Sequence, residues 1–355
     1  MNSWLGLGGS GLVKIKVGIL TAPHIEFEQR EKTFVLKNVR IGIGFHWDRY
    51  EDQEFDGELE IKPTPNPSLK GGEPWEVAIN TIDLEDYLCS VISSEMSANS
   101  PMELLKAHAV ISRSWAIRAM EHPNHEGFHV CADDHCQRYE GLRRINERAV
   151  EAVRATKGQV LMYDNTICDC RYYKCCGGRT EVWRTCWEDI DVPYIQSVPC
   201  DWCKSPSPKV LRLVLNDYDQ ETKDFRDWQV TYTADELSEI IRTKSGIDFG
   251  EIIGLIPLKR GASGRIYELK IVGTKRTEII GKELKIRLWL SKSCLYSSWF
   301  EVEHENGVWT LIGHGWGHGA GLCQIGAAVM ASEGKTYEEI LQYYYHGARL
   351  GVAAQ

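Results

Sequence analysis

Residues 83–115 read DLEDYLCSVISSEMSANSPMELLKAHAVISRSW, and this stretch predicts two consecutive amphipathic helices. Asp83 is a typical N-cap, and apolar residues follow it on one helical stripe: Leu84, Tyr87, Leu88, Val91 and Ile92. The second start combines an N-cap serine, Ser100, with a proline at the first helical position and a glutamate three residues after the cap. This helix should reach about Met120. Glu95 lies at the junction, where a side chain can project into a cleft.

Strand signals surround this helix pair. Alternating or β-branched residues predict strands at 13–17, 33–41, 75–79 and 158–167, and largely β structure at 209–232 and 252–302. Prolines and glycines predict a loop at 63–72. Further helices are expected at 147–157, 234–244, 324–332 and 336–345. Because strands and helices are segregated, the sequence predicts an α+β fold, mainly β, with the helix pair and C-terminal helices.

The expected domains are an N-terminal β-rich segment at 1–74 and a second domain at 75–350, with a β-rich insertion at about 205–305. The net charge of −9 argues against general nucleic-acid binding, which requires a basic surface. No run of about 18 apolar residues occurs, so no transmembrane segment is expected. Residues 1–10 lack the charged and apolar regions of a signal peptide.

Four residues form the best metal-binding pattern: His125, Cys131, His135 and Cys136. Nitrogen and sulfur ligands suit tetrahedral zinc, and a closed shell of four protein ligands is typical of a structural site. A Cys131–Cys136 disulfide with idle histidines is the alternative, and His122 and His129 are spare candidates for ligands. A metal here would order the following segment, so that Gln137 and Tyr139 could line a sugar site.

A second group of cysteines follows: Cys168, Cys170, Cys175, Cys176, Cys186, Cys200 and Cys203. Cys200-Asp-Trp-Cys203 is a CxxC motif, which by itself fits zinc, a redox pair or a disulfide. Pro199 and Pro206 argue against a thioredoxin-like strand-to-helix junction. Disulfides and a second zinc site both remain open for this group.

The stretch GHGWGHGAG at 313–321 predicts a glycine-rich loop. Neither a lysine nor a Ser/Thr follows at P-loop spacing, so it is not a phosphate-binding motif. Repeated glycines let the backbone approach a ligand, Trp316 offers a flat face for a sugar ring, and His318 and Gln324 supply hydrogen-bonding groups. The alternative is a tight glycine turn with buried histidines.

Three segments together resemble the SpoIID/LytB family. The first is residues 86–115, which are similar to the family pattern DYL..V…EM followed by ALKAQAVAART; the second is Gly177-Gly-Arg-Thr-Glu181 with Trp187 and Pro193-Tyr194; the third runs from Gly313 to Ala327 and ends in 337–345. Their order and spacing fit over about residues 75–350. Three departures stand out: Ser97 replaces the usual proline, residues 172–176 read YYKCC, and the family's leader or anchor is absent.

The resemblance implies a lytic transglycosylase that cleaves peptidoglycan glycan strands and leaves 1,6-anhydro-N-acetylmuramic acid ends. Glu95 is then the general acid and base, since glycoside cleavage needs a carboxylic acid to protonate the leaving oxygen. The alternative is a solvent-exposed glutamate at a helix end. Lys106 and Arg113 are two helical turns apart on one face and match a Lys and an Arg of the family motif. They could bind the lactyl carboxylate of the sugar or hold Glu95 in place.

These residues are expected to form a cleft between the Glu95 helix pair and the glycine loop. The family further implies a bacterial cell-envelope location outside the cytoplasm, peptidoglycan as partner, and an association with a cell-wall amidase. Two other functions remain open. One is a non-catalytic glycan-binding module that enhances an amidase, and the other is a zinc-dependent hydrolase that uses the His/Cys residues.

Overall fold

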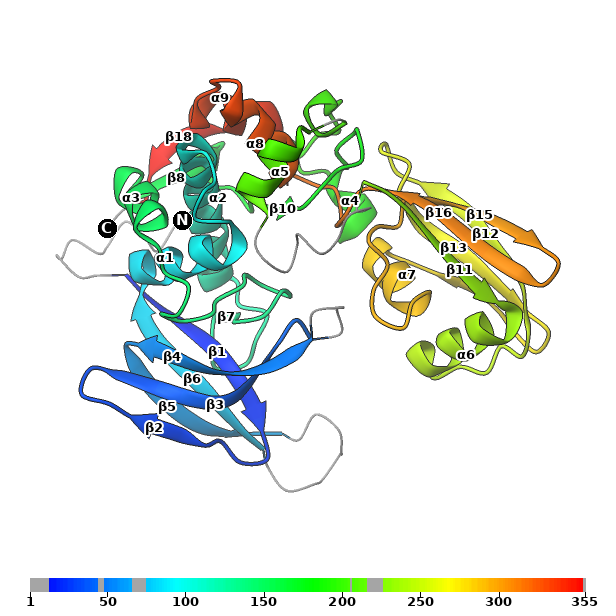
Figure 1. Ribbon diagram of the computed structural model, residues 1–355, viewed down its shortest axis with the longest axis horizontal. Coiled ribbons are helices and arrows are strands. Elements are labelled where there is room, and N and C mark those ends of the chain that lie inside the picture. Colours follow the sequence, from blue (N-terminus) through cyan, green and yellow to red (C-terminus); the bar gives the residue numbers. More distant parts are fainter. Residues whose placement is uncertain (1–12, 44–47, 66–74, 205, 216–225, 354–355) are drawn as a thin grey trace. The chain divides into compact units, whose positions relative to one another are not determined.

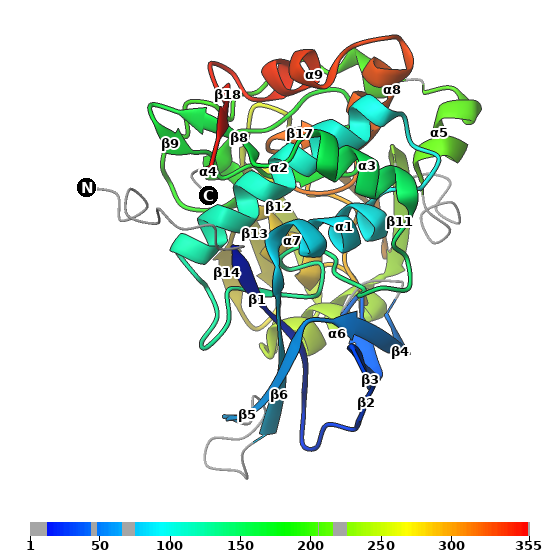
Figure 2. The ribbon, with the colours of Figure 1, turned by 90° about the vertical axis from the view of Figure 1, so that its left-hand side faces the viewer.

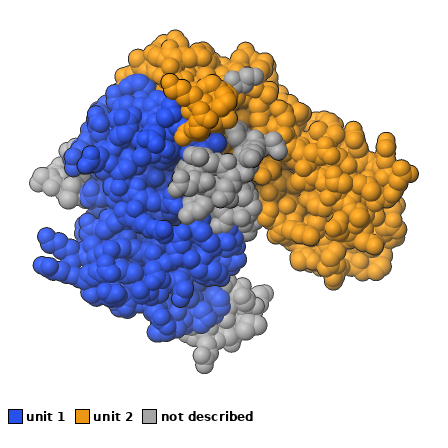
Figure 3. Space-filling view, viewed as in Figure 1, with its two compact units in different colours: residues 1–170, 213–216, 349–355 blue, residues 171–212, 217–348 orange. Residues whose placement is uncertain are grey.

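The computed structural model describes residues 13–43, 48–65, 75–204, 206–215 and 226–353. The chain forms two compact units, shown in different colours in Figure 3. Unit 1 consists of residues 1–170, 213–216 and 349–355, and unit 2 consists of residues 171–212 and 217–348. The expectations for residues 1–10, and for most of the loop at 63–72, lie outside the described residues.

Two of the sheets of unit 1 are built mainly from its N-terminal strands (Figure 1). One has the strand order β5-β6-β1-β7, with β1 at Lys14–Ala22, β5 at Glu58–Thr64, β6 at Trp75–Asp83 and β7 at Val130–Cys131. The other contains β2 (Phe27–Gln29), β3 (Thr33–Ile41) and β4 (Arg49–Asp56). Strand β5 extends into the expected loop and includes Pro63, which an edge strand tolerates because one side of its backbone is not paired. Pairing of β1 with β6 crosses the predicted domain boundary at residue 74.

Three helices form the other part of unit 1, and they lie side by side in Figure 2: α1 (Leu84–Glu95), α2 (Met102–Glu121) and α3 (Glu147–Ala155). Asp83 caps α1 as predicted, since its side chain accepts a hydrogen bond from the backbone N–H of Glu85. The short sheet β18-β8-β9 adjoins them, formed by β8 (Gln159–Tyr163), β9 (Thr166–Ile167) and β18 (Arg349–Val352). The buried stripe of α1 packs as the periodicity predicted.

The predicted cap of α2 is wrong by one residue. Pro101 occupies the N-cap position, and no side chain caps the helix there. The Ser100 hydroxyl instead contacts the carbonyl of Leu213 at 3.4 Å, and Glu103 pairs with Lys106 at 2.8 Å. Ser100, which the local sequence pattern assigned to a capping box, therefore makes a tertiary contact instead.

Unit 2 is built on two antiparallel sheets that share one apolar core with two helices. The first sheet has the order β11-β16-β15 and the second the order β12-β13-β14. Their elements are β11 (Asp227–Thr233), α6 (Ala234–Ser245), β12 (Ile252–Arg260), β13 (Ile266–Gly273), β14 (Thr277–Ile280), α7 (Glu283–Trp289), β15 (Phe300–Glu305) and β16 (Val308–His314). These elements occupy most of the predicted β-rich insertion.

The remainder of unit 2 has little regular structure. Its elements are β10 (Tyr172–Tyr173), α4 (Trp183–Cys186), the 3-10 helix η2 (Asp201–Cys203), β17 (Leu322–Cys323), α8 (Gln324–Ser332) and α9 (Tyr337–Tyr344). Strand β10 pairs in parallel with β17, which brings the two ends of unit 2 together. Both C-terminal helices were predicted, and α9 begins with a capping box formed by Thr336 and Glu339.

Two helices contradict the predicted β stretches. Helix α5 (Pro208–Val214), which crosses the division between the units, begins where the Ser207 hydroxyl accepts a hydrogen bond from the N–H of Val210. Ser207-Pro208 is a helix start that the β interpretation of 209–232 missed. Helix α7 interrupts the stretch 252–302 and buries Ile286 in the core of the sheets. The α+β class itself, with sheets predominating, is confirmed.

None of the helices in the described part of the chain combines the length and the apolar character of a membrane-spanning segment.

Candidate functional site

Glu95 is the last residue of α1, and its side chain is half-buried. The backbone N–H of Arg138 donates a hydrogen bond to its Oε1 at 3.1 Å. Met96, which follows it, is 1% exposed and provides an apolar neighbour. The exposed helix-end glutamate that sequence reasoning left open is therefore not what the structure shows.

The segment that contacts Glu95 is fixed to α1 by further hydrogen bonds. The Tyr87 hydroxyl donates to the Gln137 side chain at 3.1 Å, and the Ser90 hydroxyl donates to the Gly141 carbonyl at 2.6 Å. Gly141 has a φ of 64°, and a Cβ there would lie 2.2 Å from the carbonyl oxygen of Glu54, so only glycine fits this turn. The structure thus brings Glu95 and the 137–141 segment together, a contact that the sequence did not predict.

Gln137 and Tyr139 themselves are 1% exposed. Gln137 donates to the Ser112 carbonyl at 3.4 Å, and the Tyr139 hydroxyl donates to the Asn80 side chain at 2.7 Å. Burial raises the pKa of Tyr139, so its hydroxyl stays protonated. In this structure both side chains hold the segment in place, and their predicted contact with a sugar stays a prediction.

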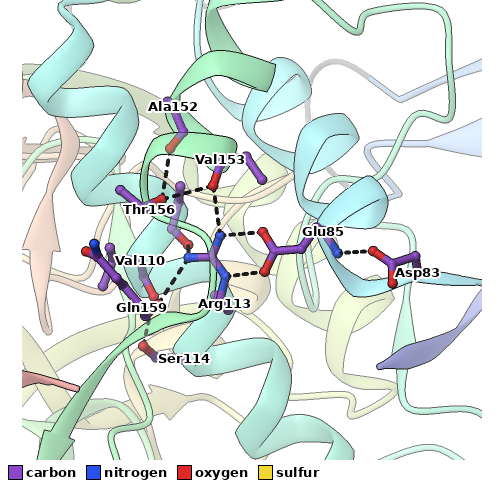
Figure 4. Close-up of polar contacts among 10 residues, drawn as sticks. Asp83, Glu85, Val110, Arg113, Ser114, Ala152, Val153, Thr156 and Gln159 are labelled. Atoms are coloured by element: carbon purple, nitrogen blue, oxygen red, sulfur yellow. Dashed lines mark hydrogen bonds and ion pairs between the residues drawn. The ribbon is translucent and has the colours of Figure 1, made fainter. Parts of the chain in front are cut away.

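Arg113 is buried in unit 1 and makes a bidentate ion pair with Glu85, as Figure 4 shows. Its Nε donates to Oε1 at 2.8 Å and its Nη2 to Oε2 at 2.7 Å. Nη1 donates to the Gln159 carbonyl at 3.0 Å. These bonds connect α2 with α1 and β8, so a contact with a sugar carboxylate would require the guanidinium to leave its partners. Lys106, by contrast, is half-buried and lies 2.8 Å from Glu103.

The predicted His/Cys residues come together in unit 1. The ligand atoms of His125, Cys131, His135 and Cys136 all lie within 4.8 Å of one another, so this cluster could hold a metal ion. His125 Nε2 is 3.2 Å from Cys136 Sγ, and His135 Nδ1 is 3.5 Å from the same sulfur. The four side chains are the donor set that sequence analysis assigned to zinc.

Two features distinguish this cluster from a disulfide with idle histidines. Neither Cys131 nor Cys136 forms a disulfide in the structure. A hydrogen bond from Cys136 lowers the pKa of Cys131 to about 4. Burial opposes this effect, and a hydrogen bond from His135 adds to it. The lowered pKa favours the thiolate, which is the form that binds a metal. The spare candidate His129 accepts a hydrogen bond from the N–H of Lys16 at 3.0 Å and is not part of the cluster.

The glycine loop lies in unit 2, and three of its side chains were predicted to contact a sugar. Trp316 and Gln324 are buried, and His318 is half-buried. Trp316 packs edge-on against Tyr296, with ring centroids 5.4 Å apart. Gly315, Gly317, Gly319 and Gly321 have positive φ angles, as a tight glycine turn requires. Sugar binding by these side chains stays a prediction.

His318 is held by hydrogen bonds at both ring nitrogens. Nε2 lies 3.0 Å from the Tyr172 carbonyl, and Nδ1 accepts from the N–H of Ala320 at 3.1 Å, so the neutral ring with its proton on Nε2 fits the site. Burial is the largest of the effects that lower the pKa of His318 well below 6.5. The positive charges of Arg171 and two further arginines lower this pKa further.

This neutral histidine predicts a loss of stability in acid. Below about pH 6.5 the unfolded chain gains a proton at His318 that the folded chain rejects, so the free energy of unfolding falls by up to about 1.4 kcal/mol per pH unit. Urea unfolding at several pH values should show a steeper acid loss for the wild type than for His318→Gln, which cannot titrate. Parallel pH profiles for the two proteins would contradict this assignment.

The predicted cleft between the helix pair and the glycine loop stays a prediction, because Glu95 belongs to unit 1 and residues 313–321 belong to unit 2. Sequence reasoning also missed a cluster in unit 2. Four buried cysteines come together there: Cys176, Cys200, Cys203 and Cys323. Three belong to the second cysteine group, but Cys323 is 120 residues beyond it in sequence, and no local motif connects it to the others.

A second missed feature is the buried carboxylate of Glu181 in unit 2. Its oxygens accept hydrogen bonds from the backbone N–H groups of Val182, Ala262 and Ser263 at 2.8–3.0 Å, and from the Ser263 hydroxyl at 2.6 Å. Gly261 lies against it so closely that a Cβ would be 2.4 Å from Oε2. Glu181, the last residue of the segment Gly177-Gly-Arg-Thr-Glu181, therefore connects this segment with the β12–β13 turn.

Comparison with known proteins covers most of the chain. Residues 75–163 match the family profile described as Stage II sporulation protein, and residues 181–321 match a domain of unknown function (DUF8618). Stage II sporulation protein D of Bacillus subtilis (strain 168) is 30% identical over 295 residues, which cover 78% of this chain and 76% of that protein.

Two further relatives agree with this match. Stage II sporulation protein D of Bacillus amyloliquefaciens is 27% identical over 293 residues, which cover 78% of this chain and 76% of that protein. The amidase enhancer of Bacillus subtilis (strain 168) is 27% identical over 295 residues, which cover 74% of this chain and 40% of the enhancer. Because stage II sporulation protein D of Bacillus subtilis is 30% identical over most of both chains, and because the helix pair lies inside the matched profile, the chain belongs to the SpoIID family.

Proposed function

We propose that this protein acts outside the cytoplasm on bacterial cell-wall glycan, as a lytic transglycosylase with Glu95 as its acid and base. The observation that carries the proposal is the setting of Glu95: a half-buried carboxyl group at the end of α1, oriented by the N–H of Arg138. It lies within the residues that match the family profile.

A general acid of glycoside cleavage typically lies in an apolar or poorly hydrated setting. Glu95 ends α1, whose last turn contains no basic residue. The next residue, Met96, is apolar and 1% exposed. These two features support the assignment of Glu95 as the acid.

One carboxyl group is sufficient for transglycosylation. The Glu95 acid would first protonate the glycosidic oxygen as the bond from the N-acetylmuramic acid anomeric carbon to that oxygen breaks. The resulting carboxylate would then remove the proton from the 6-hydroxyl of the same sugar, whose oxygen closes onto the anomeric carbon. The proton returns to Glu95, and the product carries a 1,6-anhydro ring without consumption of water.

The test is digestion of peptide-stripped glycan strands by the whole protein, with the products analysed by mass spectrometry. Products with anhydro ends, which are one water lighter than hydrolysis products, support the transglycosylase. Reducing ends instead would indicate hydrolysis. Retention of the protein on glycan without any cleavage would favour the alternative, a glycan-binding module that enhances an amidase, as the name of the amidase enhancer suggests.

We assign the His/Cys cluster to a structural zinc ion. Four nitrogen and sulfur ligands close a tetrahedral shell, and a zinc hydrolase needs an open position for water. Cys136 precedes Arg138, whose N–H orients Glu95, by two residues. This placement supports a structural role, in which the zinc ion holds the 131–138 segment against the end of α1. Such a role argues against the zinc-hydrolase alternative.

Loss of this metal should be measurable without an activity assay. Cys136→Ser is expected to bind about one zinc ion fewer per chain than the wild type, because it removes one of four ligands. Elemental analysis and thermal unfolding are the measurements. The matched control is Cys89→Ser, a buried cysteine of α1 outside the cluster, whose pKa burial raises to about 11. Equal zinc content in all three proteins would contradict the assignment.

A further inference from the structure

The four-cysteine cluster of unit 2 is assembled from three separate segments of the chain. Cys176 follows β10, Cys200 directly precedes η2, and Cys203 is the last residue of η2. Cys323 ends β17 and is the N-cap of α8. All four side chains are 0% exposed. Their sulfur atoms lie within 4.8 Å of one another, and the Sγ atoms of Cys176 and Cys203 are 3.0 Å apart.

This spacing fits a single tetrahedral ion. Zinc–sulfur bonds of about 2.3 Å place the sulfurs of a tetrahedral site about 3.8 Å apart. A multi-iron cluster holds its cysteine sulfurs farther apart than a single ion does, so the observed limit favours one metal ion. None of the four cysteines forms a disulfide in the structure.

The backbone around the cluster donates hydrogen bonds to sulfur. The N–H of Gly178 donates to Cys176 Sγ at 3.3 Å, and the N–H of Cys176 donates to Cys323 Sγ at the same distance. The N–H of Gly326, in the first turn of α8, donates to Cys323 Sγ at 3.4 Å. Such donors stabilise thiolate ligands and orient them toward a metal, as the outer partners of structural metal sites commonly do.

Glycine is required at two of these positions for reasons of space and conformation. Gly178 has a φ of 129°, which turns its N–H back toward Cys176. A Cβ at Gly326 would lie 2.7 Å from Cys200 Sγ and 2.3 Å from the Tyr344 hydroxyl. That hydroxyl is itself 3.3 Å from Cys200 Sγ. The backbone is therefore shaped closely around the four sulfurs.

We propose that Cys176, Cys200, Cys203 and Cys323 bind a structural zinc ion, separate from the His/Cys cluster of unit 1. The ion joins segments that are 147 residues apart in sequence, in a region with only short regular elements. Metal binding supplies folding free energy where the hydrogen-bonded structure is sparse. It also fixes the base of the glycine loop, because Cys175 and Trp316 exchange backbone hydrogen bonds of 3.0 and 2.7 Å directly beside it.

A neighbouring thiol decides which variants can test the site. Cys175 is buried and directly precedes Cys176 in the chain, so its thiol could replace that of Cys176 as a ligand. Substitution of Cys176 is therefore a weak test. Cys323→Ser and Cys203→Ser remove sulfurs from the helix start and from the CxxC motif. The matched control is Cys294→Ser, a cysteine of unit 2 outside both clusters.

The first measurement is the metal content of the whole protein. Elemental analysis should find about two zinc ions per chain in the wild type and Cys294→Ser, and about one in Cys323→Ser or Cys203→Ser. Combining Cys323→Ser with Cys136→Ser should leave about none. Replacement of zinc by cobalt(II) adds a sulfur-specific readout, since the two sites contribute four and two thiolates. The sulfur-to-cobalt charge-transfer absorption should fall by about two thirds in Cys323→Ser.

Three results would overturn the proposal. Full zinc content in Cys323→Ser and Cys203→Ser excludes the site. Iron found in place of zinc would show that the bound ion is not zinc. If the cysteines still resist alkylation after the metal is chelated and the protein is denatured without a reductant, they form disulfides and not a metal site. If the variants do not fold, X-ray absorption at the zinc edge of the wild type still decides: an average near two sulfurs per zinc, in place of about three for the two sites together, contradicts the assignment.

Discussion

Glu95→Gln is expected to lower the rate of glycan cleavage by about 10²–10⁴-fold, the contribution typical of a general acid or base. Glutamine keeps the shape of the side chain, and its carbonyl oxygen can still accept the hydrogen bond from Arg138. It cannot donate a proton to the leaving oxygen. The rate is measured as the appearance of anhydro-ended products from peptide-stripped strands, with binding to the same strands measured in parallel.

The control for this substitution is Glu151→Gln, which removes an exposed carboxylate of α3 in the same unit. It should cleave at the wild-type rate. Glu95→Gln should retain its fold, its metal content and its affinity for glycan, so that only the chemical step is lost. Equal product yield from Glu95→Gln and the wild type would remove Glu95 from the mechanism, while leaving the cell-wall role open.

Arg113→Met is expected to lower the free energy of unfolding by about 3–5 kcal/mol, because it leaves the Glu85 carboxylate largely buried without its partner. The side chains of Arg113 and Glu85 are 1% and 23% exposed, so the remaining access of Glu85 to water favours the lower end of this range. Three carbonyl oxygens that the guanidinium contacts also lose their donor: those of Ala109, Val153 and Gln159. Denaturant unfolding measures the change.

Two variants distinguish this role from binding of a sugar carboxylate. Arg118→Met removes a half-exposed pair with Glu121 one turn farther along α2, and should change stability by about 1 kcal/mol or less. The double variant Glu85→Met with Arg113→Met should be more stable than Arg113→Met alone, because no carboxylate is left unpaired. If Arg113→Met keeps full stability and weakens only glycan binding, the substrate contact predicted from the sequence is correct instead.

Local sequence patterns predicted the regular elements well where packing and local preference agree. The period of apolar residues in α1, the Asp83 cap and the exact span of β3 are properties of neighbouring residues. Patterns failed where a distant contact intervened. Ser100 was expected to cap α2 but contacts the Leu213 carbonyl, and α7 lies in a stretch of strong β character because the core of unit 2 buries Ile286.

The same distinction applies to the two clusters that could hold a metal ion. The sequence by itself determined the first one, because His125, Cys131, His135 and Cys136 lie within twelve residues and a short loop can bring them together. It also determined the family, through three motifs in order. Only the tertiary structure decided the second cluster, since the parallel pairing of β10 with β17 is what carries Cys323 to Cys176.

The roles of single side chains likewise depend on burial, which sequence spacing does not specify. Lys106 and Arg113 share a helix face in the sequence, yet the fold buries Arg113 against Glu85 and leaves Lys106 half-exposed. His318 is a neutral, half-buried histidine because β10 and the glycine turn supply partners for both ring nitrogens. A motif identifies which groups are available, whereas the free-energy cost of leaving a buried charge or polar atom without a partner decides which contacts they make.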